Sequence, residues 1–400
     1  MTEQAKVPAI RFAGFTDPWE QRKLGELFEE SDERASDREI LSVSVANGIY
    51  PASESDRETN PGASLANYKI VHFGDVVYNS MRMWQGAVDA SRYDGIVSPA
   101  YVVARPNSEV YARFFARLLR QPMLLKQYQQ VSQGNSKDTQ VLKFDDFASI
   151  GISMPASENE QRRIGGFFDR LDSLITLHQR KYDKLVIFKK SMLEKMFPKD
   201  GESVPEIRFA GFTDPWEQRE LVDIAEIVGG GTPDTNNSNY WDGDIDWYAP
   251  AELGNNIYAE SSTRKITQAG FDSCSTKMLP ADKTILFTSR AGIGNTAILR
   301  HSACTNQGFQ SLVIGDADVY FVYSMSERIK KWAEEKASGS TFLEISGRQL
   351  ETMPVNLPSL VEQQAIGSFF SHLDDLITLH QRKLELLQNI KKSLLDKMFA

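Results

Sequence analysis

Apolar residues recur at steps of three and four along two long stretches of the chain, residues 158–197 and 360–399. The pattern persists for more than four heptads, which predicts two long helices with a coiled-coil seam. Such a stripe is not stable alone in water, so the two helices are expected to pair with each other. The best-defined seam positions are Ile164, Phe168, Leu171 and Ile175 in the first stretch, and Ile366, Phe370, Leu373 and Ile377 in the second.

The segment before each helix has a different pattern. Strand-like runs at 38–45, 74–79 and 100–106 are separated by turn residues, and a helical stretch at 109–130 follows. Short strands with one or two helices predict a mixed α+β domain. The second such block, residues 222–358, opens with GGGTPDT.

Two segments of the chain occur twice in nearly the same form. PAIRFAGFTDPWEQRKL at 8–24 returns as PEIRFAGFTDPWEQREL at 205–221, and EQRRIGGFFDRLDSLITLHQRK at 160–181 returns as EQQAIGSFFSHLDDLITLHQRK at 362–383. TDPW is expected to form a capped turn that leads into a short helix. Glu160-Gln161 and Glu362-Gln363 are expected to cap the long helices.

The cyclic order of these repeats implies a pseudo-two-fold arrangement with an antiparallel helix pair. The predicted fold class is therefore α+β, with two mixed α+β domains separated by two long antiparallel coiled-coil helices. The expected boundaries are 1–24 and 200–221 for the constant segments, 25–155 and 222–358 for the variable domains, and 156–199 and 359–400 for the helices.

Composition excludes several classes of protein. No apolar run reaches the roughly 18 residues of a membrane helix, and the N-terminus lacks the pattern of a signal peptide. The cysteines, Cys274 and Cys304, are too few for a disulfide framework or a four-ligand zinc site, so a reducing, cytoplasmic setting is expected. The net charge of −9 is unusual for a nucleic-acid binder but allows a local contact surface.

The sequence shows no constellation typical of catalysis or of metal binding. No Ser-His-Asp set, paired carboxylates, HExxH motif or nuclease cluster is present, so no catalytic residue and no metal ligand is predicted. His178 and His380 fall on the helix seams, where they are expected to be interface residues.

The repeats resemble the DNA specificity subunit of type I restriction-modification systems. The resemblance rests on IGGFFDRLDSLITLHQRK, IGSFFSHLDDLITLHQRK and the twice-used IRFAGFTDPWEQR, and it covers essentially the whole chain. The second variable block adds family-like landmarks, which are GGTP at 230–233, YWDGDIDWY at 240–248, LPADKTILFTSRAGIGNTAI at 279–298, TNQGFQSL at 305–312 and SGSTFLEISGRQLETMPVNLP at 338–358. The first block lacks GGTP and NQG and has only looser equivalents.

This resemblance implies a non-catalytic reader of double-stranded DNA. Each variable block would be a target-recognition domain for one half of a bipartite sequence. The helices would set the spacing and dock two methyltransferase subunits, which restriction subunits join. AdoMet, ATP and Mg²⁺ would belong to those partners and not to this chain. A helix of about 39 residues is roughly 58 Å long, enough to hold two domains one DNA turn apart, roughly 34 Å.

Loops near glycines are the candidate DNA contacts in the second block. Backbone amides of GGTP could hold a phosphate, Arg290 could contact a base or a phosphate, and the amides of Asn306 and Gln307 could read adenine. A plain turn, a surface salt bridge for Arg290 and turn capping by Asn306-Gln307 are the alternatives. The candidate residues are Gly230, Gly231, Thr232, Thr288, Ser289, Arg290, Asn306, Gln307, Ser338, Ser340 and Thr341.

The first block offers a second set of candidates at corresponding positions. Lys137 could neutralise a phosphate, whereas Trp84 is expected to be a core residue more than a base-stacking one. The candidate residues are Asn79, Ser80, Arg82, Trp84, Asn135, Ser136 and Lys137.

Two other classes of protein remain as alternatives. A non-catalytic coiled-coil scaffold with two protein-binding domains would explain the helices and the negative charge. It would not explain why the two frames, each a constant segment with its long helix, are nearly identical while the variable blocks between them differ. A fused restriction-methylation enzyme would need motifs that are missing. The near-identity of 8–22 and 205–219 further suggests the hypothesis that recombination exchanges recognition domains.

Overall fold

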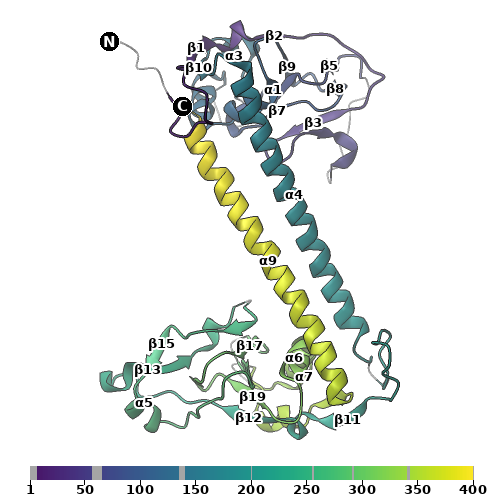
Figure 1. Ribbon diagram of the computed structural model, residues 1–400, viewed down its shortest axis with the longest axis vertical. Helices are drawn as coiled ribbons and strands as arrows, with labels where there is room; N and C mark the ends of the chain where they lie inside the picture. The colour runs from purple at the N-terminus through teal and green to yellow at the C-terminus, as the bar shows by residue number, and fades with distance from the viewer. Residues whose placement is uncertain are drawn as a thin grey trace. The chain divides into compact units, whose positions relative to one another are not determined.

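The computed structural model of the chain describes residues 7–55, 65–134, 140–199, 201–254, 256–290, 292–339 and 343–399. The chain forms two compact units. Unit 1 comprises Met1–Gln179 and Arg382–Ala400, and unit 2 comprises Arg180–Gln381. Each unit therefore holds one variable block, the first part of one long helix and the last part of the other (Figure 1).

The two predicted long helices are present as α4, Glu158–Lys195, and α9, Leu360–Met398. In unit 1 the Lys391 ammonium of α9 pairs with the Asp172 carboxylate of α4, and Ile175 packs in one cluster with Leu387. In unit 2 the Lys189 ammonium of α4 pairs with Asp374 of α9. Because later residues of α4 meet earlier residues of α9, the helices run antiparallel where they meet inside each unit (Figure 1).

Unit 1 is built on an antiparallel sheet of order β2-β9-β6-β7. Its strands are β2 Phe28–Glu30, β6 Val76–Asn79, β7 Val88–Ala90 and β9 Tyr101–Pro106. Strands β1 Glu20–Lys23 and β10 Gly151–Met154 form a separate pair, as do β3 Leu41–Ser44 with β4 Gly48–Pro51 and β5 Lys69–Val71 with β8 Gly95–Val97.

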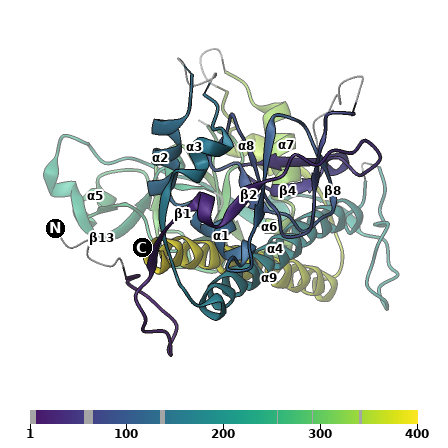
Figure 2. The ribbon, with the colours of Figure 1, turned by 90° about the horizontal axis from the view of Figure 1, so that it is seen from above.

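Helices cover this sheet. They are α1 Ala112–Leu118, α2 Pro122–Val131 and α3 Phe144–Ala148, with single 3₁₀ turns at Leu24–Glu26, Ala52–Glu54 and Met83–Gln85. The expected helical stretch 109–130 is thus split, because Pro122 begins a new helix and cannot continue the previous one. Helices α2 and α3, which are near each other in Figure 2, contribute Leu124, Tyr128 and Phe147 to one buried cluster.

Unit 2 has an antiparallel core of order β12-β19-β16-β17, to which β14 adds in parallel. The strands are β12 Ala225–Gly229, β14 Tyr258–Ala259, β16 Thr284–Phe287, β17 Thr296–Leu299 and β19 Gln310–Ile314. A second sheet of order β15-β13-β18 contains Arg264–Ile266, Trp241–Tyr248 and Cys304–Thr305, and β11 Glu217–Glu220 pairs with β20 Pro354–Leu357. The helices are α5 Gln268–Asp272, α6 Val319–Ser324, α7 Ser326–Lys336 and α8 Gly347–Glu351, with 3₁₀ turns at Leu221–Asp223, Ser238–Tyr240 and Pro250–Glu252.

The two variable blocks share one topology although their sequences have diverged. Strands β2, β9, β6 and β7 of unit 1 correspond in order and direction to β12, β19, β16 and β17 of unit 2. The blocks differ in what is added to this sheet. Unit 1 adds the β3-β4 hairpin and the antiparallel β5-β8 pair, and unit 2 adds β14 and the sheet around β13. Both blocks are mixed α+β, as predicted.

The seam residues are buried in a different environment from the expected one. Ile164, Phe168 and Leu171 belong to the core cluster of the variable block in unit 1, and Ile366, Phe370 and Leu373 belong to that of unit 2. Ile175 and Ile377 are only partly buried. Further along the helices the expected seam is only partly buried. Leu185, Leu387 and Leu394 pack against the two core clusters, whereas Phe188 and Ile390 are 44% and 38% exposed. The globular block, together with the last turn of the other helix, covers the start of each helix.

The constant segments also depart from the prediction in one respect. TDPW leads into strand β1 in unit 1 and β11 in unit 2, not into a short helix. The residues after Trp19 and Trp216 pair with the strand that closes each block, Gly151–Met154 and Pro354–Leu357. A long-range strand partner therefore overrides the local capping signal.

Over the described ranges, no helix is long and apolar enough to cross a membrane. Within those same ranges, no three His, Cys, Asp or Glu side chains converge as a metal site would require. Cys304 is buried and Cys274 is partly buried, and both thiols are free.

Candidate nucleic-acid interface

The four candidate segments of the second block meet in unit 2. The Gly231 amide donates to the Thr305 carbonyl oxygen at 2.9 Å, which joins the GGTP loop to the TNQG loop. The Ser289 amide donates to the Gly308 carbonyl at 2.8 Å, which adds the turn after β16. The Ile345 amide donates to the Ser289 carbonyl at 3.1 Å, which adds the segment after α7. Segments distant in sequence thus form one loop cluster at the ends of β12, β16 and β19.

Gly230 is required for the contact between the first two loops. A Cβ atom at this position would lie 2.2 Å from the carbonyl oxygens of Thr305 and Asn306. The side chains of Thr232 and Gln307 are hydrogen-bonded across the same contact. Because the Gly231 amide is already used inside the protein, the expected phosphate cradle is not formed by that amide, and GGTP serves here as a close-packing loop.

Thr288 and Ser289 are fully buried, which corrects their assignment as direct DNA contacts. The Thr288 hydroxyl donates to the Gly292 carbonyl at 2.5 Å and accepts from the Asn295 amide at 2.9 Å. These bonds shape the turn that carries Arg290. Polar side chains at the end of a buried strand can therefore hold a loop without touching what the loop binds.

Some of the described candidates do face outward. Gln307 and Ser338 are exposed, and Arg290 is partly exposed. The part of the chain that the structure describes places no carboxylate within ion-pair distance of Arg290, so the surface salt bridge is not observed. Asn306 follows the alternative reading, because its side-chain oxygen accepts the Gly308 amide at 2.8 Å and caps the turn.

Unit 1 repeats the same loop contacts with different residues. The Ser80 amide donates to the Ala100 carbonyl at 3.2 Å, and the Leu142 amide donates to the Ser80 carbonyl at 2.9 Å. These two bonds correspond to those that Ser289 makes in unit 2. Ser80 is therefore the counterpart of Ser289, as the sequence comparison of the two blocks predicted.

Of the other described candidates in the first block, Asn79 and Trp84 make hydrogen bonds within the turn, and Arg82 is exposed. The Asn79 side chain accepts the Met81 amide at 3.0 Å, and the Trp84 indole N–H donates to the Met81 carbonyl at 3.1 Å. Trp84 also packs against the core cluster, which agrees with its expected core role. Arg82 is exposed beside Met81.

Some candidates lie outside the described residues. They are Asn135, Ser136, Lys137, Ser340 and Thr341. The segments that contain them begin and end at matching bridges, Gln133 with Val141 in unit 1 and Ser338 with Glu344 in unit 2. This match supports the equivalence of the two segments.

A buried carboxylate lies behind the loop cluster of unit 2. Asp246 on β13 precedes Trp247, whose indole N–H donates to the Gly231 carbonyl at 2.9 Å. Burial would raise the pKa of Asp246, but hydrogen bonds from the Ser262 amide and hydroxyl, together with the interactions with His301 and Lys265, outweigh it and lower that pKa. The charged form also lies 3.3 Å from His301 and 3.5 Å from Lys265. The Asp246 carboxylate thus has its hydrogen-bond donors and a cation, Lys265, within the block.

Sequence reasoning missed the residues that attach each variable block to the start of its long helix. We call these contacts the seat of the block. Gln161 was expected to cap α4, but its side chain accepts the Tyr111 amide at 2.8 Å and donates to the Glu109 carbonyl at 3.0 Å. Glu160 is buried and accepts two hydrogen bonds from Arg11, at 2.6 and 2.7 Å. The signal was available, since the same Glu-Gln pair directly follows two blocks that share little sequence.

The same contacts recur in unit 2. Gln363 accepts the Asp318 amide at 3.1 Å, and Glu362 binds Arg208 through two hydrogen bonds of 2.7 Å. The rings of Trp19, Phe114 and Phe399 in unit 1 correspond to those of Trp216, Phe321 and Phe197 in unit 2. Each unit therefore holds its variable block through the same set of constant residues, although the loop residues of the two blocks differ.

Comparison with known proteins agrees with this organisation. Among curated proteins, the MjaIX specificity subunit of a type I restriction enzyme from Methanocaldococcus jannaschii is 36% identical over 190 residues, which is 46% of this chain and 44% of that protein. The putative MjaX specificity subunit of the same organism is 24% identical over 353 residues, 83% of this chain and 79% of that protein. The solved S subunit of a type I restriction-modification system from M. genitalium has the same fold, with a TM-score of 0.56 at 16% identity and 99% of each chain covered.

The family comparison extends over both repeats. The model of the type I restriction modification DNA specificity domain matches residues 16–186 and again residues 213–389. Each match begins in a constant segment, includes a variable block and ends in a long helix. The chain belongs to the family of type I restriction-modification DNA specificity proteins.

Proposed function

We propose that this chain is the DNA sequence-specificity subunit of a type I restriction-modification complex, in which each variable block reads one half of a bipartite target. The observation that carries the proposal is the repeated loop cluster. Ser80 and Ser289 make the same backbone bonds in their units, while the exposed residues nearby differ. One scaffold with two sets of exposed side chains is suited to two different half-sites.

Base and phosphate contacts are assigned to the exposed members of each cluster. In unit 2 these are Arg290 and Gln307, whose guanidinium and amide groups can pair with guanine and adenine edges in the major groove. In unit 1 Arg82 has the corresponding role. The buried members, Thr288 and Ser289, fix the loop from which Arg290 projects.

The long helices offer one equivalent apolar surface in each unit. Leu174 and Leu177 are each 46% exposed on α4 in unit 1, and their counterparts on α9 in unit 2, Leu376 and Leu379, are 44% and 45% exposed. Exposed leucines that recur at the same positions with the same exposure suit two copies of one partner. We assign these surfaces to two methyltransferase subunits, with restriction subunits added to that core.

The chain itself is assigned no chemical step. The described residues of the loop clusters are suited to hydrogen bonding and charge pairing, and none of those described residues is paired with a base that would activate it as a nucleophile. In this proposal AdoMet, ATP and Mg²⁺ are bound by the partner subunits.

Exchange of one block tests the proposal. Replacing residues 222–358 with the corresponding block of another family member should change one half of the methylated sequence and leave the other half intact. Methylation is mapped across a host genome that expresses the chain with its methyltransferase. A change in both halves would contradict modular reading. Unchanged methylation, or binding of the assembled complex to DNA that ignores sequence and salt, would favour the scaffold alternative.

A further inference from the structure

The long helices α4 and α9 begin with nearly the same sequence, and these repeated segments differ at only a few positions. Residues 160–181 and 362–383 differ at Arg162/Gln364, Arg163/Ala365, Gly166/Ser368, Asp169/Ser371, Arg170/His372 and Ser173/Asp375. Among these, the Asp169/Ser371 difference removes a carboxylate. In unit 1 that carboxylate faces the variable block, so the difference bears directly on how the block is held.

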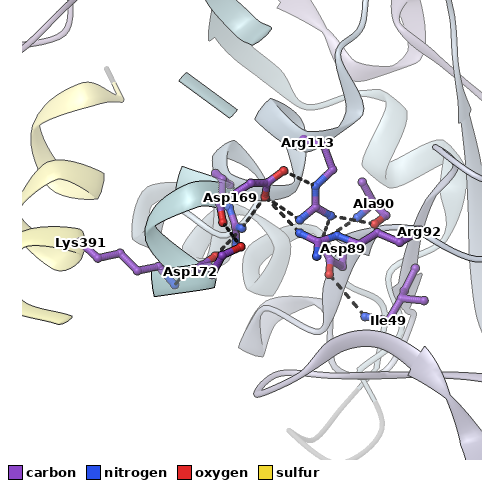
Figure 3. A network of polar contacts seen from close by, with 10 residues as sticks. Ile49, Asp89, Ala90, Arg92, Arg113, Asp169, Asp172 and Lys391 are labelled. Atoms are coloured by element: carbon purple, nitrogen blue, oxygen red, sulfur yellow. Dashed lines mark hydrogen bonds and ion pairs between the residues drawn. The ribbon is translucent and has the colours of Figure 1, made fainter. Parts of the chain in front are cut away.

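Asp169 is the centre of an ionic network in unit 1 (Figure 3). Arg113 of α1 binds its two carboxylate oxygens at 3.0 and 2.7 Å, which is a bidentate contact. Arg117 of α1 lies 3.1 Å from the same carboxylate and also reaches Asp172. Arg92 of the variable block also lies 3.2 Å from Asp169, and Lys391 of α9 pairs with Asp172 on its other side.

The network extends into the block beyond α1. The Arg113 guanidinium also donates to the Ala90 carbonyl at 3.0 Å and lies 3.3 Å from Asp89. The Asp89 carboxylate in turn accepts the Ile49 amide at 3.4 Å (Figure 3). The side chains of Arg113 and Arg117 are only 12% and 10% exposed, so their charges depend on these partners and not on water.

Unit 2 has no such arginines at the corresponding positions. Phe114 and Phe321 occupy equivalent places against Phe399 and Phe197, so Arg113 corresponds to Tyr320 and Arg117 to Ser324. The Tyr320 hydroxyl donates to Asp374 at 2.7 Å, and Lys189 supplies the single cation at that carboxylate among the described residues. The Ser324 hydroxyl donates to the Tyr320 carbonyl at 2.7 Å. In unit 2, therefore, the uncharged residues Tyr320 and Ser324 of the variable block face the helix that carries Ser371.

We propose that residue 169 of the first frame, and residue 371 of the second, decides which variable block each frame accepts. A block with the Arg113 and Arg117 pair requires Asp at this position, whereas a block with Tyr320 and Ser324 does not. Asp169 is a positioning residue, because it acts on DNA reading only through the seat of the block. The two frames are therefore not interchangeable, although their constant segments are nearly identical.

The direct test moves the first block into the second frame. Residues 25–155 replace residues 222–358 in the full chain, which puts Arg113 and Arg117 opposite Ser371. The chimaera should unfold at a midpoint roughly 10 °C below that of the same chimaera with Ser371→Asp, because two mostly buried guanidinium groups lose a shared carboxylate. His372→Arg, which restores a neighbouring and exposed frame difference, is the matched control and should leave the midpoint of the chimaera low.

A second test uses the natural order of blocks and avoids a chimaera that fails to fold. Asp169→Ser should lower the unfolding midpoint of the parent chain, and Arg170→His should not. Adding Arg113→Tyr and Arg117→Ser to Asp169→Ser should recover most of the loss, because the block then carries the side chains that suit a serine frame.

The outcomes separate this inference from the proposed function. Chimaeras with and without Ser371→Asp that share one midpoint, whether high or low, would overturn the inference, as would a triple variant no more stable than Asp169→Ser alone. A stable chimaera with Ser371→Asp whose complex fails to methylate a target with two copies of the first half-site would instead count against DNA reading. The unfolding midpoint measures how well the block is held on its helix and does not involve DNA. The midpoint result and the methylation result therefore test the two proposals separately.

Discussion

Substitution of Gly230 by alanine tests whether close packing of two loops creates the candidate interface. The new Cβ would lie 2.2 Å from the carbonyl oxygens of Thr305 and Asn306 and 2.4 Å from the Thr305 hydroxyl. Two of these three atoms belong to the backbone and cannot rotate away. The GGTP loop must therefore move by about 1 Å, since ordinary carbon-oxygen contacts are longer than about 3 Å.

The magnitude follows from the contacts that this movement breaks. Overpacking costs about 1–3 kcal/mol, and the loss of the Gly231–Thr305 hydrogen bond adds about 1 kcal/mol. At roughly 2–4 °C per kcal/mol for a unit of this size, the unfolding midpoint should fall by roughly 5–15 °C. Affinity for the half-site read by unit 2 should fall as well, while preference at the other half-site should persist.

Gly229→Ala is the matched control. A Cβ at Gly229 would lie 3.6 Å from the flexible Gln310 side chain and 4.0 Å from the Phe309 carbonyl oxygen. Both are ordinary contacts, so this neighbouring change should leave stability and DNA binding close to those of the parent. The measurements are thermal unfolding of the chain and binding of the assembled methyltransferase to duplexes altered in one half-site at a time. Equal behaviour of the two alanine variants would refute the argument that close approach at Gly230 builds the interface.

Three further predictions concern the seat of the blocks and the contact residues. Leu373→Asp places an unpaired charge in the core of unit 2 and should cost several kcal/mol in thermal unfolding, and a variant that folds and assembles like the parent would contradict it. Burial would raise the pKa of Asp169, but the hydrogen bond from Arg113 and the positive charges of Arg113, Arg117 and Arg92 together outweigh it and hold the folded-state pKa below the ordinary 3.8. The stabilisation is therefore complete above about pH 4 to 5 and lost as the pH falls through the folded-state pKa, and Asp169→Asn should reduce this acid dependence of the unfolding midpoint. If Arg290 reads guanine, Arg290→Ala should cost about 1–3 kcal/mol of binding free energy and relax specificity at one base pair. If Arg290 binds phosphate, the substitution should weaken binding to all sequences and reduce the slope of affinity against salt by about one unit. Unchanged binding at every salt concentration would remove Arg290 from the interface.

The candidate site was only partly predictable because loop residues have two kinds of role. Thr288, Ser289 and Arg290 are consecutive and all polar, yet Thr288 and Ser289 are buried and Arg290 is not. Nothing in the local sequence distinguishes a hydroxyl that shapes a turn from one that meets a ligand, because the difference depends on which distant segment covers it. Asn306 illustrates the same point, since its amide closes its own turn.

The sequence by itself determined the features that depend on repetition and periodicity. The two long helices, the doubled frame and the mixed character of the blocks follow from patterns that recur along the chain, since apolar residues at helical spacing indicate a helix and apolar residues in short alternating runs indicate strands. Family membership follows from the same repeats.

Only the tertiary structure decided what those repeats hold. The burial of Glu160 and Gln161, the strand after TDPW, and the pairing of Arg113 with Asp169 all join residues that are far apart in the sequence and come from different elements of the fold. The common sheet of the two blocks is also a tertiary result, since strands in one order can be built from sequences that share only their burial pattern. Local chemistry names the residues able to make a contact, and long-range packing selects the partners with which they make it.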